Sequence, residues 1–95
     1  MRHRDRNNVI FDILISLEPR RGSPITHLMR KANLNYYQAT RYLNLLLKRG
    51  YVLKEDGKYR ISSLGKEWVK TYLRLKELDK IAFEDGGNAI SGVRQ

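Results

Sequence analysis

The chain has 95 residues, 41% of them apolar and 31% charged, which suits one small hydrophobic core and leaves no room for a second domain. Its 19 Lys and Arg against 10 Asp and Glu give a net charge of +9, and residues 1–60 alone carry +8, so a polyanionic partner is favoured. The absence of cysteine excludes disulfides, thiolate metal sites and thiol nucleophiles, and the sequence has neither a membrane-spanning apolar run nor a secretory signal. We therefore expect a cytoplasmic protein.

Residues 1–7 form a basic arm that could lie along DNA and that we expect to be disordered in the free protein. A first helix is predicted for residues 8–18, because apolar residues recur there at helical spacing and Pro19 marks a stop. Phe11 and Ile15 lie roughly opposite this apolar stripe, so the helix has two apolar sides. One side is expected to meet the core and the other a different surface.

A second, short helix is predicted to follow Ser23 and to end near Asn33, with Ser23 as its N-cap and Pro24 in its first turn. Only three residues then separate it from a third helix over residues 36–49, for which Asn35 is the expected N-cap and Gly50 the stop. At 100° per residue, one arc of the third helix is mainly apolar: Tyr36, Ala39, Leu43, Leu46 and Leu47. The opposite arc carries Tyr37, Gln38, Arg41, Leu45 and Lys48.

Two short β-rich runs follow, joined by Asp56-Gly57, a dipeptide typical of tight hairpin turns. Tyr59 alternates with Lys58 and Arg60, as expected for a strand with one packed and one wet face. Ser62 or Ser63 is expected to cap a last helix that reaches about residue 84, and the glycines after it predict a loose tail over residues 85–95.

The order helix, helix, three-residue turn, helix, hairpin, helix is typical of a winged helix-turn-helix. We therefore predict a mainly α fold with a small β-hairpin wing, consisting of a domain over residues 8–63 and a long helix over residues 64–84. In this architecture the third helix enters the DNA major groove and the wing lies near the adjacent backbone or minor groove.

The segments GSP, ANLNY, RYL and DGKYRIS..GKE, within residues 8–78, resemble the small winged-helix DNA-binding proteins of thermophilic archaea. These form a ten-kilodalton, chromatin-associated family whose members pair through a C-terminal coiled coil. The resemblance implies a homodimer that binds double-stranded DNA and associates with the nucleoid. Gly86 and Gly87 interrupt the last helix earlier than the family pattern implies.

The polar arc of the third helix is the predicted DNA-reading face, on which Gln38 suits adenine and Arg41 suits guanine. Asn35 or Tyr37 is expected to contact phosphate, Lys48 to contact the backbone, and Leu45 to meet a thymine methyl or a partner chain. The full predicted set of DNA contacts is Asn35, Tyr37, Gln38, Arg41, Asn44 and Lys48 in the third helix, Lys54, Lys58 and Arg60 in the wing, and Arg20 and Arg21 in the first loop. Two simpler explanations stay open, namely that the polar arc is a solvated face and that the wing lysines protect a sheet edge.

The last helix carries a stripe at three- and four-residue steps: Leu64, Trp68, Tyr72, Leu75, Leu78 and Ala82. Its first half is expected to pack on the winged domain with Trp68 as the main contact, whereas the apolar residues beyond Leu73 need a partner. The predicted dimer interface comprises Phe11, Ile15, Leu75, Leu78 and Ala82. The alternative is a monomer in which the last helix folds back on the first.

Neither catalysis nor a cofactor is expected from this sequence. His3 and His27 stand apart from other metal ligands, and the serines are better explained as helix caps than as nucleophiles. We also expect no metal, no membrane association and no small-molecule substrate. Two alternatives to DNA binding remain, a protein-interaction module and an RNA-binding protein in which Tyr36 and Tyr37 stack on bases.

Overall fold

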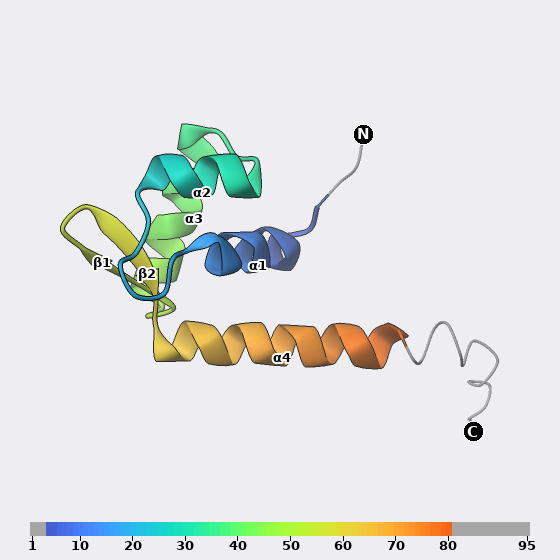
Figure 1. Ribbon diagram of the computed structural model, residues 1–95. Coiled ribbons are helices and arrows are strands. Elements are labelled where there is room, and N and C mark those ends of the chain that lie inside the picture. The colour runs from blue at the N-terminus through green and yellow to red at the C-terminus, as the bar shows by residue number, and fades with distance from the viewer. Residues whose placement is uncertain (1–3, 81–95) are drawn as a thin grey trace, which may run out of the picture.

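The computed structural model describes residues 4–80 as four helices and one β-hairpin (Figure 1). The elements are α1 (Arg6–Ser16), α2 (Ile25–Ala32), α3 (Tyr36–Lys48), β1 (Val52–Glu55), β2 (Lys58–Ile61) and α4 (Ser63–Lys80). This order confirms the predicted mainly α fold with a small β wing. Residues 81–84 of the predicted last helix, and the predicted tail, lie outside the described residues.

The first three helices and the base of the wing enclose the core. In Figure 1, α2 lies in front of α3, and α1 lies below them. The largest fully buried side chains come from all of these elements: Ile13, Leu14, Leu28, Leu43, Leu46 and Val52. Since burying one such side chain stabilises a protein by about 1.5–3 kcal/mol, these six residues hold α3 firmly against the other two helices.

Helix α1 begins two residues earlier and ends two residues earlier than predicted. Its N-cap is Asp5, whose carboxylate accepts a hydrogen bond from the Asn8 backbone N–H at 2.8 Å. The Arg4 guanidinium donates to Asp12 Oδ2 and to the Ala32 carbonyl, both at 2.7 Å. The prediction of a disordered arm over residues 1–7 is therefore wrong for residues 4–7. Arg6 and Asn7 belong to α1, Asp5 caps it, and Arg4 is bonded to α1 and to the end of α2.

Ser23 is not the N-cap of α2, because the N-cap is Pro24, which makes no side-chain capping bond. The Ser23 hydroxyl instead accepts a hydrogen bond from the Glu18 N–H at 2.9 Å. Its backbone exchanges two 2.8 Å hydrogen bonds with Tyr59 on β2. Ser23 thus joins the α1–α2 loop to the wing.

Both predicted ends of α3 are confirmed. Asn35 and Gln38 form a reciprocal capping box at its start. At its end, Gly50 adopts a φ of +80°, and the Tyr51 N–H donates to the Leu46 carbonyl at 2.9 Å. This left-handed glycine with a backward hydrogen bond is a Schellman motif, which turns the chain directly into β1.

The hairpin turn at Asp56-Gly57 is confirmed, with φ values of +52° and +74°. The two-residue turn pairs Glu55 with Lys58 and fixes the register along both strands. Because strand side chains alternate, the wing has two faces. The inner face carries Val52, Lys54, Tyr59 and Ile61, and includes the two core residues of the wing; the outer face carries Leu53, Glu55, Lys58 and Arg60.

Helix α4 starts at a serine cap and packs beneath α1 (Figure 1). The Ser62 hydroxyl accepts from the Gly65 N–H at 3.0 Å and donates to the Gly50 carbonyl at 2.6 Å, as the predicted cap requires. Trp68 is partly buried against the core, as expected, and its ring stacks on Tyr72 of the same helix at 5.2 Å. Tyr72 in turn lies 5.0 Å from the Phe11 ring on α1. The Tyr72 hydroxyl also donates to Asn8 Oδ1.

The packed side of α4 differs from the predicted stripe, since it includes Gly65 and Val69 and leaves out Leu64. The side chains turned toward the domain are Trp68, Val69 and Tyr72, with Gly65 at the closest approach. Leu64 was expected among them but is 51% exposed, because it lies about 100° around the helix from Gly65. It belongs with Leu75 and Leu78, which are also half exposed. No helix within residues 4–80 combines the length and apolarity needed to cross a bilayer.

Candidate nucleic-acid interface

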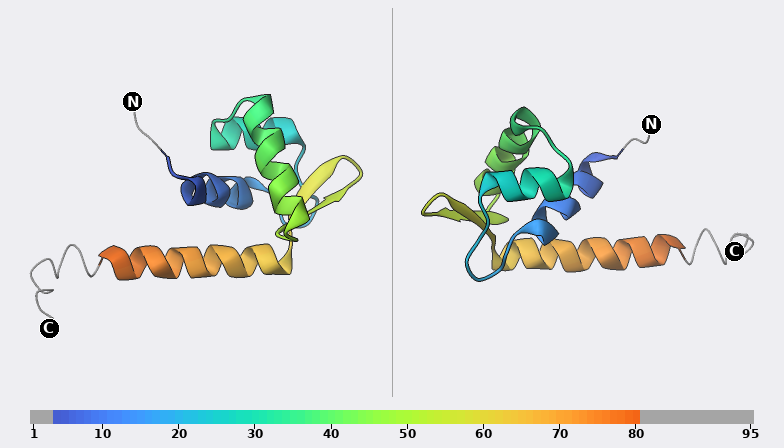
Figure 2. Two further views of the ribbon diagram at one scale, coloured as in Figure 1. Left: turned by 180° about the vertical axis from the view of Figure 1, so that it is seen from behind. Right: turned by 45° about the horizontal axis from the view of Figure 1, so that its top comes forward.

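The outward side of α3 is exposed along its length. Ala39, Leu43 and Leu46 are at most 1% exposed and fix the inward side. Seen from behind in Figure 2, α3 lies in front of the domain and no other element crosses it. The exposed arc consists of Tyr37, Arg41, Asn44 and Lys48. These four residues, together with Arg6 described below, are called the reading face.

Arg41 lies at the middle of this arc and is exposed. Its guanidinium carbon lies 5.6 Å from the centroid of the Tyr37 ring, one helical turn earlier. A cation over an aromatic face at this distance is held by electrostatic attraction while its N–H donors stay accessible. Tyr37 thus orients Arg41 outward.

The capping box restricts what Asn35 and Gln38 can do. Gln38 Oε1 accepts from the Asn35 N–H at 3.0 Å, and Asn35 Oδ1 accepts from the Gln38 N–H at 2.8 Å. A bidentate pair with adenine uses both the oxygen and the nitrogen of a glutamine amide. With one bond already accepted by its oxygen, Gln38 has its NH₂ group and one lone pair left, and the cap restricts how the amide can turn toward adenine.

Arg6 is a residue of this face that the sequence prediction missed. A pocket of about 360 Å³ is lined by Arg6 from α1 and by four residues of α3, Gln38, Arg41, Tyr42 and Leu45. It brings two guanidinium groups to one concave surface, with the half-buried Leu45 at its side. Arg6 was assigned to the arm, although Asp5 as an N-cap would have placed it in the first turn of α1.

The remaining predicted basic residues fall into a second group. Lys54 lies on the inner face of the wing, with its Nζ 5.4 Å from the Tyr59 ring centroid. On the other side of the wing, a pocket of about 280 Å³ is lined by Arg20, Arg21, Glu55, Asp56, Lys58 and Arg60. Arg20, Arg21, Lys58 and Arg60 are called the outer cluster. The structure therefore does not bring all the predicted contacts onto one surface.

Comparison with known proteins assigns the fold to a family. A family model described as winged helix-turn-helix matches residues 3–80. The chain belongs to the winged helix-turn-helix family. An uncharacterised protein of Methanocaldococcus jannaschii is 34% identical to it over 79 residues, which span 82% of this chain and 76% of the relative. The crystal structure of Sso10a-2, a DNA-binding protein from Sulfolobus solfataricus, matches with a TM-score of 0.72 and 26% identity, covering 97% of this chain and 99% of that chain.

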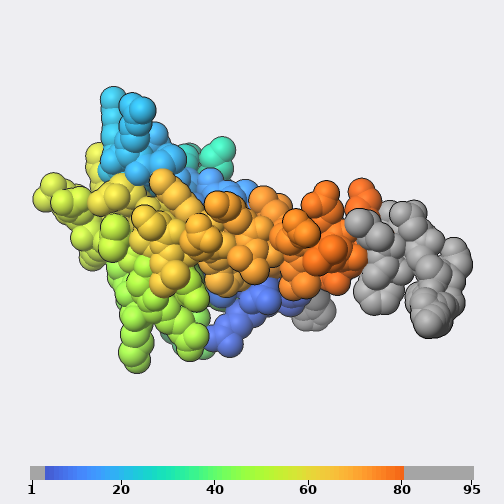
Figure 3. Space-filling model, turned by 90° about the horizontal axis from the view of Figure 1, so that it is seen from below, coloured from blue at the N-terminus to red at the C-terminus, as the bar shows by residue number. Residues whose placement is uncertain are grey.

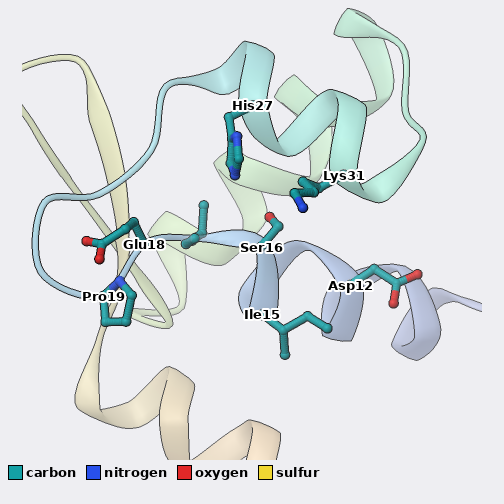
Figure 4. A pocket seen from close by; sticks show the side chains of 8 residues that line it. Asp12, Ile15, Ser16, Glu18, Pro19, His27 and Lys31 are labelled. Carbon is teal, nitrogen blue, oxygen red and sulfur yellow. The ribbon is translucent and has the colours of Figure 1, made fainter.

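The α1–α2 loop of this winged helix is held in shape by Glu18. Its Oε1 accepts hydrogen bonds from the backbone N–H groups of Arg20 at 2.8 Å and Arg21 at 2.6 Å. Figure 4 shows the Glu18 side chain beside the start of this loop. The bond from the Arg21 N–H is the main cause that lowers the pKa of Glu18, with the Arg20 N–H and the two arginine charges adding to it.

Acid should loosen this loop of the winged helix. Because the pKa of Glu18 is lower in the folded state, its contribution is complete above the ordinary glutamate value of about 4.3 and is lost as the pH falls through the folded value. We expect an NMR titration to show Glu18 Cδ and the amides of Arg20 and Arg21 shifting together, below pH 4.3. In Glu18→Gln these amide shifts should be independent of pH in that range. A Glu18 carboxyl that titrates at or above 4.3 would contradict the prediction.

A third pocket of the winged helix lies between α1 and α2 and differs in chemistry from the basic surfaces. It measures about 460 Å³, and its lining includes Asp12, Glu18, His27 and Lys31 beside the apolar Ile15 (Figure 4). Its two carboxylates stand against a single lysine, so it lacks the excess of cations that an anion-binding surface needs. Among residues 4–80, no three His, Cys, Asp or Glu side chains are grouped so that they could hold a metal ion.

Proposed function

We propose that this chain binds double-stranded DNA by inserting α3 into the major groove. The observation that carries the proposal is the unobstructed outward arc of α3, with Arg41 exposed at its centre and Arg6 beside it. The winged helix-turn-helix fold, the net charge of +9 and the likeness to Sso10a-2, which is described as a DNA-binding protein, support it.

Each residue of the reading face has a role that suits a groove. Arg41 can donate two hydrogen bonds to guanine O6 and N7, and Asn44 can reach base edges one turn further along the helix. Lys48, Tyr37 and Arg6 flank this centre and suit phosphate oxygens. Lys54 lies on the inner face of the wing, and we propose that it contacts the adjacent backbone.

We further propose that two copies pair through α4. Leu64, Leu75 and Leu78 are 51%, 51% and 49% exposed, and with Thr71 they share one side of the helix at heptad-like steps. Ile15 is 56% exposed and can extend this surface, whereas Phe11 is already in contact with Tyr72 of its own chain. Ala82, the remaining predicted interface residue, lies outside the described residues. A two-fold pair would present two reading faces.

A salt-dependent duplex titration tests DNA binding. With about six phosphate contacts, the log–log slope of affinity against salt should be near −5. A ratio below about ten between unrelated duplexes favours a role in chromosome organisation in the nucleoid, whereas a ratio above about a thousand favours transcriptional control. No retardation of duplex DNA at micromolar protein would contradict the proposal and favour a protein-interaction module, and preference for a competing RNA would favour RNA binding.

Pairing should weaken when the exposed leucines are shortened. Leu75→Ala with Leu78→Ala removes apolar surface from both copies, and we expect a roughly tenfold rise in the dimer dissociation constant, about 1.4 kcal/mol. Sedimentation equilibrium measures it. Glu77→Ala, about 160° around α4 from Leu75 and about 100° from Leu78, is the control and should leave association unchanged. Ordinary association has dissociation constants in the micromolar range. A wild-type chain that stays monomeric at about 100 μM would therefore contradict pairing.

A further inference from the structure

The outer cluster lies on the other side of the domain from the reading face. In Figure 3, which views the molecule from below, the blue loop after α1 and the light green end of α3 project in opposite directions from the start of α4. The strand register agrees, because it places Lys58 and Arg60 on the wing face opposite Lys54. One straight duplex lying on α3 would therefore leave the outer cluster facing away from it.

The arginines of the cluster are carried on a loop whose backbone is already fixed. Glu18 bonds the N–H groups of Arg20 and Arg21, and Ser23 pairs with Tyr59 on β2. Gly22 adopts a φ of +80°, and a Cβ there would come within 3.0 Å of the Tyr59 carbonyl oxygen. Because the loop needs no ordering on binding, the entropy cost of fixing it is absent.

The charges of the cluster are largely free for an external anion. Among residues 4–80, Arg20, Arg21 and Lys58 form no ion pair, while Arg60 lies 3.5 Å from Glu55. The carboxylates of Glu55 and Asp56 also line the pocket, and the Glu18 carboxylate bonds the loop backbone at Arg20 and Arg21, so four cations face three carboxylates. A modest excess of spread cations suits singly charged phosphodiesters along a strand better than one compact, multiply charged ligand.

We propose that the outer cluster is a second phosphate-binding site, which contacts the backbone of a second DNA duplex while the reading face holds the first. The inference rests on the proposed function, because it assumes that α3 engages a duplex. Arg20 and Arg21 bind phosphate oxygens at the loop, and Lys58 and Arg60 extend the contact along the wing. Because these contacts are to phosphate oxygens alone, the second site is independent of sequence.

Binding stoichiometry per chain tests this inference, and it does not depend on whether the chain pairs. We would titrate the protein at low salt with a duplex of about 12 base pairs, slightly over one helical turn, and follow it by calorimetry and sedimentation. Wild type should bind two duplexes per chain, one of them tightly. Arg20→Ala with Arg21→Ala should bind one, with the tight affinity unchanged within about twofold.

A matched control is the exposed basic pair of α2. Arg30→Ala with Lys31→Ala removes the same number of charges outside both sites and should still bind two duplexes. One duplex per wild-type chain, with an affinity that depends on Arg41, would overturn this inference and leave the proposed function intact. A tight affinity that falls more than about fivefold in Arg20→Ala with Arg21→Ala, roughly 1 kcal/mol, would place the cluster on the first duplex and also overturn it. No binding of any duplex would overturn both.

Discussion

Replacing Arg41 by alanine is expected to weaken duplex binding about thirtyfold, or about 2 kcal/mol, and to reduce discrimination between duplexes. The guanidinium is held over Tyr37 with its donors outward, so the free protein has already positioned the group that would meet guanine. Removing it leaves a base edge without partners, and such losses cost about 1–3 kcal/mol per bidentate pair. Fluorescence anisotropy on a panel of unrelated duplexes at fixed salt measures both effects.

Lys48→Ala is the matched comparison for Arg41. Lys48 lies on the same arc, nearly two turns further along α3, and is expected to contact only phosphate. Its loss should weaken all duplexes equally and reduce the salt slope by about 1. If Arg41→Ala behaves like Lys48→Ala, with a uniform loss and the same change of slope, Arg41 contacts the backbone and does not read bases.

Gly65→Ala is expected to destabilise the fold by about 3 kcal/mol, although alanine is the better helix former by about 1 kcal/mol. A Cβ on Gly65 would lie 2.3 Å from the Tyr51 carbonyl oxygen and 2.7 Å from Ile61 Cγ1. The carbonyl is backbone and accepts the Ser62 N–H, so it cannot move aside without losing that hydrogen bond. The start of α4 must therefore separate from the wing.

Urea unfolding followed by circular dichroism measures this cost, and Lys66→Ala provides the control. Lys66 is the next residue in α4 and is exposed, so its replacement should change stability by less than about 0.5 kcal/mol. A Gly65→Ala protein as stable as wild type, or more stable, would show that helix propensity outweighs the close approach to Tyr51.

The elements with local signals were predictable from the sequence. Asn35, Gly50 and Asp56-Gly57 fix the ends of α3 and the hairpin turn through contacts within a few residues, and the structure has all of them as expected. The capping role of Gln38 was also available, since a glutamine three residues after the cap is its usual signature. The resemblance to a winged helix depended on the same local features.

The features that were not predicted depend on contacts between distant residues. The Arg4 guanidinium donates to the carbonyl of Ala32, which is 28 positions away in the sequence, and patterns among neighbouring residues cannot predict such a hydrogen bond. Gly65 appears to be an ordinary helical glycine until Tyr51 and Ile61 are placed against it. Strand alternation predicted that the wing has two faces, but it could not show that Arg20 and Arg21 join the face turned away from α3.

The Ser62 hydroxyl has a mechanical consequence for the whole molecule. One oxygen bonds both the Gly50 carbonyl, just after α3, and the Gly65 N–H, in the first turn of α4. These two bonds connect the end of α3 to the start of α4 and restrain the angle between the two helices. Two copies joined along α4 would hold their two reading faces at a fixed separation. Such a pair would resist DNA curvature that does not match this separation.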